Sequence, residues 1–441
     1  DKYSLDKGRV FLTGTQALVR LPIIQRKIDQ SNGINTACYI SGYTGSPLGG
    51  YDHALNQASD FLDENEIVFQ PGINEDLAAT ALHGTQQTTL VEKPKYDGVF
   101  GIWYGKGPGV DRSGDALKHG NYAGTSKYGG VLALAGDDHG AKSSTTAHQS
   151  DHAFIHFGMP ILNPATVQDY LDFGVLGFAM SRYSGCWVGF KCVTDTVESA
   201  ASVDISLDRF KPVIPNDDPI GDENIHIQWG FAPAASEPRL YKTRLPAAQA
   251  FARANSIDKV IFEDKKKLGI VTSGKAYLDV RQALDELGLD DELCKKIGVS
   301  LFKVGMVWPL DDKKILDFSK GHKELLVIEE KRPIVEDQLI KYLYNNKNRP
   351  MIVGKKDENG DYLVPGEGEL SPSLVALIIA KRISNLSLNI DLTKKVNEIE
   401  EFLQSINQSP ASNLFRLPSF CAGCPHNTST KVPEDSFAFG G

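Results

Sequence analysis

Glu75 stands where a buried strand is expected to run into a helix. Residues 69–86 have the sequence FQPGINEDLAATALHGTQ, in which the strand ends through Pro71-Gly72 and apolar residues then repeat at helical spacing. Asn74 suits a helix cap, so we expect the helix to open with Glu75 and to end near Gly84. Either this carboxylate merely complements the helix dipole, or it is fixed at the mouth of a sheet for chemistry.

The segment that leads to Glu75 is one of four segments, rich in glycine and polar residues, that follow expected strands. Strands that alternate with helical stretches indicate a parallel sheet with both faces covered, and ligands of such sheets bind at the carboxyl ends of the strands. One glycine-rich exit is usually a turn, but four that carry reactive side chains favour a shared site. These segments are 41–50, 71–75, 105–114 and 136–152.

Cys421 and Cys424 form a Cys-x-x-Cys pair near the end of the sequence. Zinc sites, iron–sulfur clusters and redox dithiols all use this spacing, and a buried thiol pair without a metal is the remaining alternative. Two thiolates complete none of these metal sites, so further ligands would lie past Gly441. The other four cysteines have apolar or helical surroundings and are expected to be core thiols: Cys38, Cys186, Cys192 and Cys294.

The composition is that of an ordinary globular chain with two or three domains. Its 441 residues are 41% hydrophobic and 23% charged, and the net charge of -9 argues against a nucleic-acid binder. No apolar run approaches the roughly 20 residues that span a bilayer, and the first residues lack a signal-peptide core. We therefore expect a cytoplasmic protein, with no nucleic-acid or membrane partner. Because the sequence starts without Met and stops just after the Cys-x-x-Cys pair, we expect it to be part of a longer protein.

The predicted fold is α/β, with doubly wound, mostly parallel sheets. We expect a first domain over residues 1–239 and a smaller α/β domain over 240–410, with a final region over 411–441. A segment rich in Pro, Asp and Asn, 212–238, marks the departure from the first domain. The second domain shows no evident reactive cluster, which favours a role in packing and subunit contact.

Several of these segments together resemble the indolepyruvate ferredoxin oxidoreductases, most closely their long fused form. The segments are SGYTGSPLGGYD, GINEDLAATALHGTQ, WYGKGPGVDRSGD, ALAGDDHGAKSSTTAHQSDH and FCAGCPHNTSTKVPE. This family belongs to the 2-oxoacid:ferredoxin oxidoreductases that depend on thiamine diphosphate. The resemblance implies a pyrimidine-binding domain, then a transketolase C-terminal-like domain, then the start of a pyrophosphate-binding domain, so that the chain looks like the N-terminal portion of such an enzyme.

The resemblance also implies a reaction and its cofactors. In the family, a glutamate at the position of Glu75 hydrogen-bonds the pyrimidine nitrogen N1′ of thiamine diphosphate, and Cys421 and Cys424 match the first two ligands of a [4Fe-4S] cluster. The implied reaction is oxidative decarboxylation of a 2-oxoacid such as indolepyruvate to an acyl-coenzyme A, with electrons passed to ferredoxin. The Mg²⁺ site would lie outside this stretch, since no Gly-Asp-Gly occurs here. We expect a homodimer, and no turnover by these residues alone.

Other site residues are expected at the neighbouring strand ends. By resemblance, Tyr43, Thr44 and Ser46 line the substrate side, while Gly45, Ser46 and Pro47 contact the cofactor. A 2-oxoacid carboxylate needs hydrogen-bond donors. The candidate donors are Lys106, Arg112, His139 and the hydroxyl groups of Ser143 and Ser144.

Two alternative functions and two structural ambiguities stay open. The chain could belong to a thiamine enzyme of transketolase type without iron, or to a non-catalytic assembly subunit that binds zinc through its cysteine pair. His148, His152 and His156 could form a metal cluster or be ordinary loop histidines. Trp103, Tyr104 and Tyr43 suit an aromatic substrate, but aromatics at strand ends are more often core residues.

Overall fold

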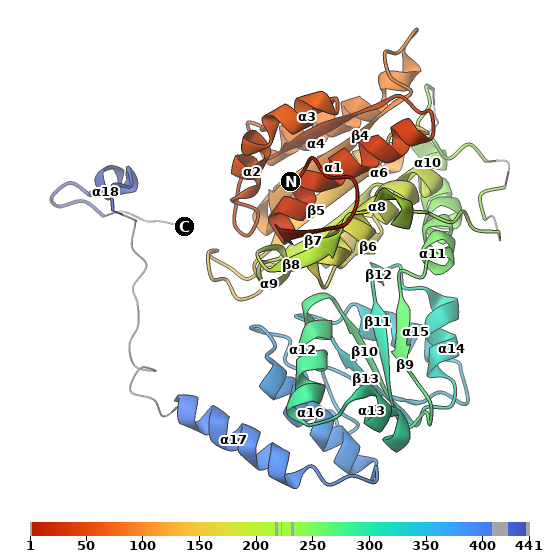
Figure 1. The fold of residues 1–441 in the computed structure, drawn as a ribbon, viewed down its shortest axis with the longest axis vertical. Coiled ribbons are helices and arrows are strands. Elements are labelled where there is room, and N and C mark those ends of the chain that lie inside the picture. The colour runs from red at the N-terminus through yellow and green to blue at the C-terminus, as the bar shows by residue number, and fades with distance from the viewer. Residues whose placement is uncertain (1, 217–218, 222, 231–232, 408–421, 438–441) are drawn as a thin grey trace. The chain divides into compact units, whose positions relative to one another are not determined.

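The structure, a computed structural model, describes residues 2–216, 219–221, 223–230, 233–407 and 422–437. Contacts between residues divide the chain into two compact units, 1–390 and 391–441. Figure 1 shows the elements of both units, and each unit is described by itself below.

Seven strands form the larger sheet of the 1–390 unit, and six of them run parallel (Figure 1). Its central strands are near-continuous apolar runs, such as VLALAGD in β5, because both faces of a parallel sheet are covered. The order across the sheet is β12 (Met306–Trp308), β6 (Ile161–Leu162), β7 (Val188–Val193), β5 (Val131–Asp137), β4 (Gly98–Lys106), β2 (Thr36–Gly42) and β3 (Ile67–Phe69).

Helices pack on both faces of this sheet. One face carries α1 (Gly14–Ser31), α2 (Tyr51–Gln57), α3 (Ser59–Glu64), α8 (Val167–Ser184), α9 (Thr194–Val197) and α11 (Leu245–Ala254). The other face carries α4 (Glu75–Gln86), α5 (Gly107–Arg112), α6 (Gly114–Ala123) and α7 (Asp151–Phe157). The remaining helical elements of this part are the short η1 (Thr88–Leu90) and η2 (Leu207–Arg209), α10 (Pro233–Arg239) and the π-helical η3 (Leu240–Arg244).

A second α/β sheet lies in the same unit. Its strand order is β14 (Met351–Val353), β13 (Glu324–Ile328), β10 (Leu268–Ser273), β11 (Val299–Val304) and β9 (Lys259–Phe262), with β9 antiparallel to β11 and the other pairs parallel. The helices of this part are α12 (Gly274–Glu286), α13 (Asp291–Ile297), α14 (Asp312–Ser319), α15 (Val335–Leu343) and α16 (Pro372–Asn385).

The two sheets are joined by a strand that changes sheet at Gly305. β11 belongs to the smaller sheet, whereas β12, one residue later, pairs antiparallel with β6 at the edge of the larger sheet. Asp258 holds this switch, because its Oδ1 accepts hydrogen bonds from the main-chain N–H groups of Gly305 (2.7 Å) and Met306 (3.0 Å). One apolar cluster also runs across both sheets and includes Trp103 and Val304.

The predicted α/β class with mostly parallel sheets is confirmed, and several elements are additions. The sequence pattern did not indicate α1, whose N-terminus has a capping box between Thr13 and Gln16, or the antiparallel ribbon of β1 (Arg9–Thr13) and β8 (Ala200–Asp204). Helix α4 continues to Gln86, two residues past the expected end. The four predicted core thiols are all buried. The boundaries at residues 239 and 410 stay a prediction.

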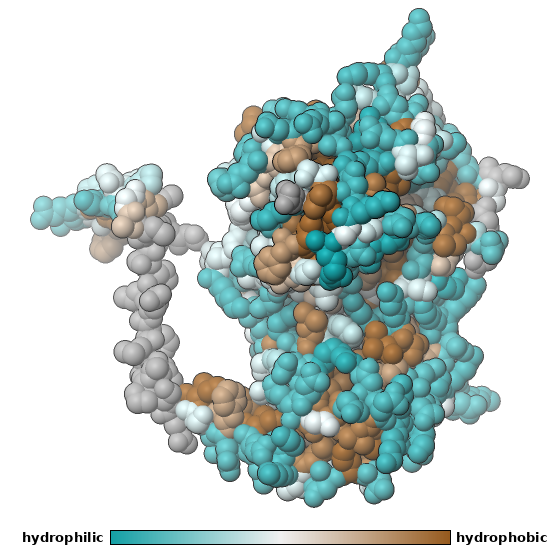
Figure 2. Space-filling model, in the orientation of Figure 1, coloured by the Kyte–Doolittle hydropathy of each residue, from teal (hydrophilic) through white to brown (hydrophobic). Residues whose placement is uncertain are grey.

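The 391–441 unit contains α17 (Thr393–Asn407) and α18 (His426–Ser429). Two large apolar side chains of α17 are exposed, Phe402 to 56% and Ile406 to 50%, and brown atoms mark this helix in Figure 2. Figure 2 also shows hydrophilic residues over most of the visible surface. Within the described part of the chain, no helix combines the length and the apolar character needed to cross a membrane.

The Asp258 carboxylate at the sheet switch makes stability depend on pH. Burial raises its pKa from 3.8 to about 6, although the two main-chain donors oppose the rise. The folded protein therefore holds this proton more tightly than the unfolded chain, so that stability is lost as pH rises from 3.8 to about 6. The loss is on the order of 3 kcal/mol.

We expect Asp258→Asn to remove this contribution and so to reduce the slope of stability against pH, as measured by urea unfolding at a series of pH values. Asp63→Asn, which replaces an exposed acid of α3, is the matched control and keeps the wild-type slope. An unchanged slope in Asp258→Asn would contradict the assignment.

Candidate functional site

The four glycine-rich segments meet at the carboxyl edge of the larger sheet. β2, β4 and β5 are adjacent and parallel, so their exits lie side by side, and the loop after β3 is joined to β2 by a hydrogen bond from the Gly72 N–H to the Gly42 carbonyl (2.8 Å). This edge is therefore built as the sequence predicted, with Glu75 on the loop-to-helix junction beside it.

The main chain of Glu75 is held by its neighbours. Asn74 caps α4 by accepting a hydrogen bond from the Leu77 N–H (2.9 Å), so Glu75 occupies the first helical position. Trp103, fully buried in β4, donates its indole Nε1–H to the Glu75 carbonyl (3.0 Å). The residue thus has a fixed backbone at the sheet edge.

The side chain of Glu75 lies against two glycines of the β4 exit. A β-carbon on Gly109 would lie 2.7 Å from its Oε1, and one on Gly105 would lie 3.5 Å from its Cγ. Within the described ranges, its carboxylate makes no hydrogen bond or ion pair. Glu75 is half-buried, whereas nearby Ile73 and Leu77 are exposed to 85% and 52%. The arrangement leaves an acid available to a group from outside this part of the chain.

The loop after β2 packs on the two neighbouring strands. Tyr43 and Thr44 are exposed, and the Thr44 hydroxyl donates to the Gly49 carbonyl (3.3 Å). A β-carbon on Gly45 would lie 3.1 Å from Cβ of Lys106, and Pro47 is buried next to Gly136. Ser46 is half-buried in the same loop. Trp103 and Tyr104, in contrast, are fully buried core residues.

The predicted carboxylate-binding donors divide into two groups. Lys106 donates to the Ser143 carbonyl (2.6 Å), and Arg112 pairs with Asp76 (3.2 Å) with both side chains largely exposed, so these two cations remain at the edge near Glu75. Ser143 donates its N–H to Asp138 (2.8 Å), and the Ser144 hydroxyl donates to the same carboxylate (2.7 Å).

His139 points away from this edge and into the contact with the second sheet. It is 5% exposed, its Nδ1 lies 3.8 Å from Oε2 of Glu330, and its carbonyl accepts a hydrogen bond from Lys331 (2.9 Å). Burial, together with nearby lysines such as Lys191, lowers the pKa of His139 well below its ordinary value. The imidazole is therefore neutral at pH 7.

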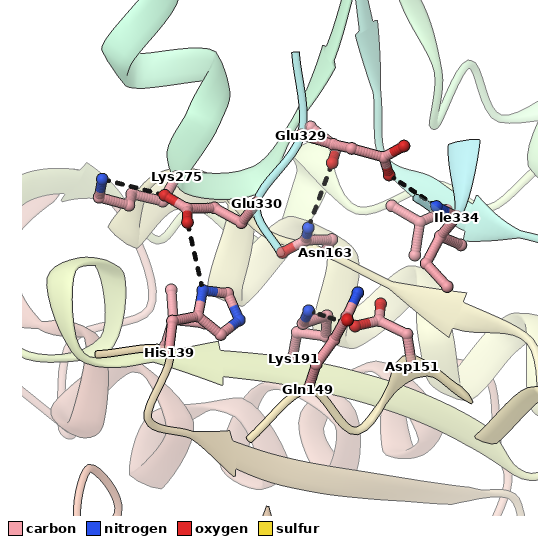
Figure 3. A pocket seen from close by; sticks show the side chains of 12 residues that line it. His139, Gln149, Asp151, Asn163, Lys191, Lys275, Glu329, Glu330 and Ile334 are labelled. Carbon is pink, nitrogen blue, oxygen red and sulfur yellow. Dashed lines mark hydrogen bonds and ion pairs between the residues drawn. The ribbon is translucent and has the colours of Figure 1, made fainter. Parts of the chain in front are cut away.

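A small polar cavity lies between the two sheets (Figure 3). Its volume is about 20 Å³, room for a water molecule rather than for a substrate. Figure 3 shows Glu330 between Lys275 and His139, and Lys191 directed at Asp151. The part of the chain that forms the smaller sheet thus supplies charged groups, Lys275 and Glu330, to a cluster that its sequence did not reveal.

Lys191 and Asp151 form the ion pair at the base of this cavity. Their charged atoms are 2.6 Å apart, Asp137 lies 3.7 Å from the same ammonium group, and all three side chains are buried. Burial opposes the charge of Lys191, but the two carboxylates outweigh it and raise its pKa; burial also raises the pKa of Asp137. Sequence reasoning missed Lys191, because it lies within an apolar strand.

Of the two cysteines expected to bind a metal, one lies within the described residues. Cys421 lies outside the described residues, and Cys424 is half-buried. Among the residues that the structure describes, no three His, Cys, Asp or Glu side chains come together as a metal site. His148 instead lies 3.3 Å from Asp111, and the ring of His156 packs on Phe157.

Comparisons with known proteins agree with the resemblance seen in the motifs. Residues 257–413 match the family model described as the indolepyruvate ferredoxin oxidoreductase middle domain. The chain is 24% identical, over 96% of its length, to the indolepyruvate oxidoreductase subunit IorA of Methanothermobacter marburgensis and to that of Pyrococcus abyssi. It covers 60% and 58% of these relatives, so it spans about three fifths of their length.

A solved structure shows the same fold. The 2-oxoglutarate:ferredoxin oxidoreductase from Magnetococcus marinus, with 2-oxoglutarate, coenzyme A and succinyl-CoA bound, matches with a TM-score of 0.57 at 15% identity. The match covers 86% of this chain and 65% of that one. It confirms the predicted fold class, and the sequence relatives confirm the resemblance seen in the motifs.

The buried ion pair yields a stability prediction. We expect Lys191→Met to lower the free energy of unfolding by about 3–5 kcal/mol, because Asp151 and Asp137 would be left buried without their cation. Urea unfolding measures the loss, and adding Asp151→Asn should recover part of it.

Lys320→Met is the matched control, since Lys320 and its partner Asp317 are exposed. It should change stability little. Equal effects of the two lysine substitutions would contradict the role given to Lys191.

Proposed function

We propose that this chain, a relative of the indolepyruvate ferredoxin oxidoreductases, contains the pyrimidine-binding part of a thiamine diphosphate-dependent 2-oxoacid oxidoreductase. The observation that carries the proposal is Glu75, an acid fixed at the carboxyl edge of a parallel sheet whose carboxylate has no partner in the described part of the chain. The sequence relatives and the shared fold support the same assignment.

The residues around Glu75 fit the pyrimidine ring of thiamine diphosphate. The ring presents a nitrogen that exchanges a proton, and Glu75 offers an oxygen that no neighbour occupies, with glycines rather than side chains beside it. When bound, thiamine diphosphate supplies the electron sink for decarboxylation of a 2-oxoacid. The diphosphate and its Mg²⁺ would be held by other parts of the complete protein.

Glu75 holds or gives a proton at the ring nitrogen. Its place at the first position of α4, with the main chain held by Trp103, keeps the carboxylate at the point where that proton is exchanged.

The remaining expected site residues differ in their contacts. Lys106 and Arg112 are cations at the same edge and can bind the substrate carboxylate, while Tyr43 and Thr44 face solvent beside them. Gly45, Ser46 and Pro47 stay predicted cofactor contacts. The roles predicted for His139 and Ser143 would require them to leave Glu330 and Asp138.

Electron transfer and assembly complete the proposal. Cys421 and Cys424 would begin a [4Fe-4S] cluster that passes electrons on. Ferredoxin as the acceptor and coenzyme A as the acyl acceptor are supported by the name and the bound molecules of the structural relative. Ile73 and Leu77, exposed next to Glu75, are a proposed contact for the rest of the protein or for a second copy of the chain.

The test of the proposed function is Glu75→Gln in the complete native protein. We expect 2-oxoacid-dependent reduction of ferredoxin or a dye to fall by about 10²- to 10⁴-fold, because general acid–base catalysis is lost, while the unfolding temperature changes little. Asp115→Asn is the control, since Asp115 is an exposed acid in the first turn of α6. Wild-type rates in Glu75→Gln would favour a non-catalytic assembly subunit.

Two further measurements define the reaction of the same protein. Anaerobic iron and sulfide analysis should find cluster iron, and its absence would favour a transketolase-type enzyme. Rates with indolepyruvate, a branched-chain oxoacid and pyruvate should be highest with indolepyruvate; a preference for pyruvate would contradict the aromatic substrate.

A further inference from the structure

Gly109 lies directly against the side chain of Glu75. A β-carbon at position 109 would lie 2.7 Å from Oε1, 2.8 Å from Cγ and 3.0 Å from Cδ of Glu75. All three nearest atoms belong to this one side chain, so the space beside Gly109 is the space that Glu75 fills.

The backbone at Gly109 gives no other reason for glycine. The residue lies inside α5, and its φ angle is outside the positive range, so an alanine could adopt the same conformation. Alanine is the better helix former by up to about 1 kcal/mol. The requirement for glycine therefore comes from Glu75 and not from the turn.

Gly105 contributes to the same arrangement from β4. A β-carbon there would lie 2.7 Å from the ring of Trp103, whose indole holds the Glu75 carbonyl. Gly105 thus leaves room for the ring that fixes the main chain of Glu75, and Gly109 leaves room for its carboxylate. We call these two residues the glycine slot.

We propose that Gly109 is a positioning residue, which sets the carboxylate of Glu75 by leaving it a side-chain-free surface. This inference rests on the proposed function, because the position matters only if Glu75 meets the pyrimidine nitrogen N1′. A methyl group at 109 would push the flexible carboxylate aside without unfolding the sheet edge. A displacement of about 1 Å is enough to cost on the order of 10²-fold in rate.

The experiment measures binding rather than turnover. In the complete native protein, the dissociation constant of thiamine diphosphate is compared with that of its analogue in which N1′ is replaced by CH. A hydrogen bond to a charged group makes the natural cofactor bind about 10- to 100-fold more tightly. We expect Gly109→Ala to reduce this ratio towards one.

The matched control is Gly84→Ala in α4, the helix that carries Glu75. A β-carbon on Gly84 meets no atom within 4 Å, so the ratio should stay at the wild-type value. Glu75→Ala should by itself bring the ratio of the two dissociation constants to one. Gly109→Ala added to Glu75→Ala should therefore change the ratio no further. A further loss there would mean that the methyl group acts on something else, and would overturn the proposal.

The outcomes separate the two proposals. If Glu75→Ala keeps the wild-type ratio, the proposed function fails. If Glu75→Ala brings the ratio to one and Gly109→Ala keeps the wild-type ratio, the positioning role of Gly109 is wrong and the proposed function is unaffected. If Gly109→Ala does not fold, Gly109→Ala combined with Glu75→Ala must restore folding, and failure to do so would also overturn the inference.

Discussion

The parallel pairing of β2, β4 and β5 is the constraint on which the site depends. Its register sets Gly42 opposite Tyr104 and Gly105 opposite Ala135, so the three chains leave the sheet at one edge. Segments far apart in the sequence thereby become neighbours: Gly45 lies against Lys106, and Pro47 against Gly136. An antiparallel partner in the middle of this sheet would send one of the loops to the opposite end.

Local patterns predicted this part of the molecule because local physics determines it. Buried parallel strands such as β5 are apolar along their whole length, and Asn74 places the start of α4 through a single capping bond. The same patterns missed the ribbon of β1 and β8, whose partners are about 190 residues apart and are exposed on one face. Period and composition do not specify such long-range pairing.

The charged cluster between the sheets was beyond sequence reasoning for a related reason. His139 could be named from its place after a strand, but Glu330 and Lys331, which fix it, come from a different sheet. Lys191 interrupts an apolar strand, and its meaning depends on Asp151 lying 2.6 Å away. A buried cation of this kind is stable only with its partners in place. The structural role of Lys191 can therefore be recognised only from its tertiary contacts.

The surroundings of Glu75 favour a site acid over a residue that only complements the helix dipole. An acid that merely complements a helix dipole needs no particular neighbour, and Asp76, which pairs with Arg112, already supplies one in the same turn. Asn74 satisfies the cap, and Trp103 holds the main chain. The dipole does not explain why a glycine stands at position 109, where it weakens α5 and leaves space for one carboxylate. Glycine thus lowers the helix propensity of α5 at the position where its missing side chain leaves room for the Glu75 carboxylate.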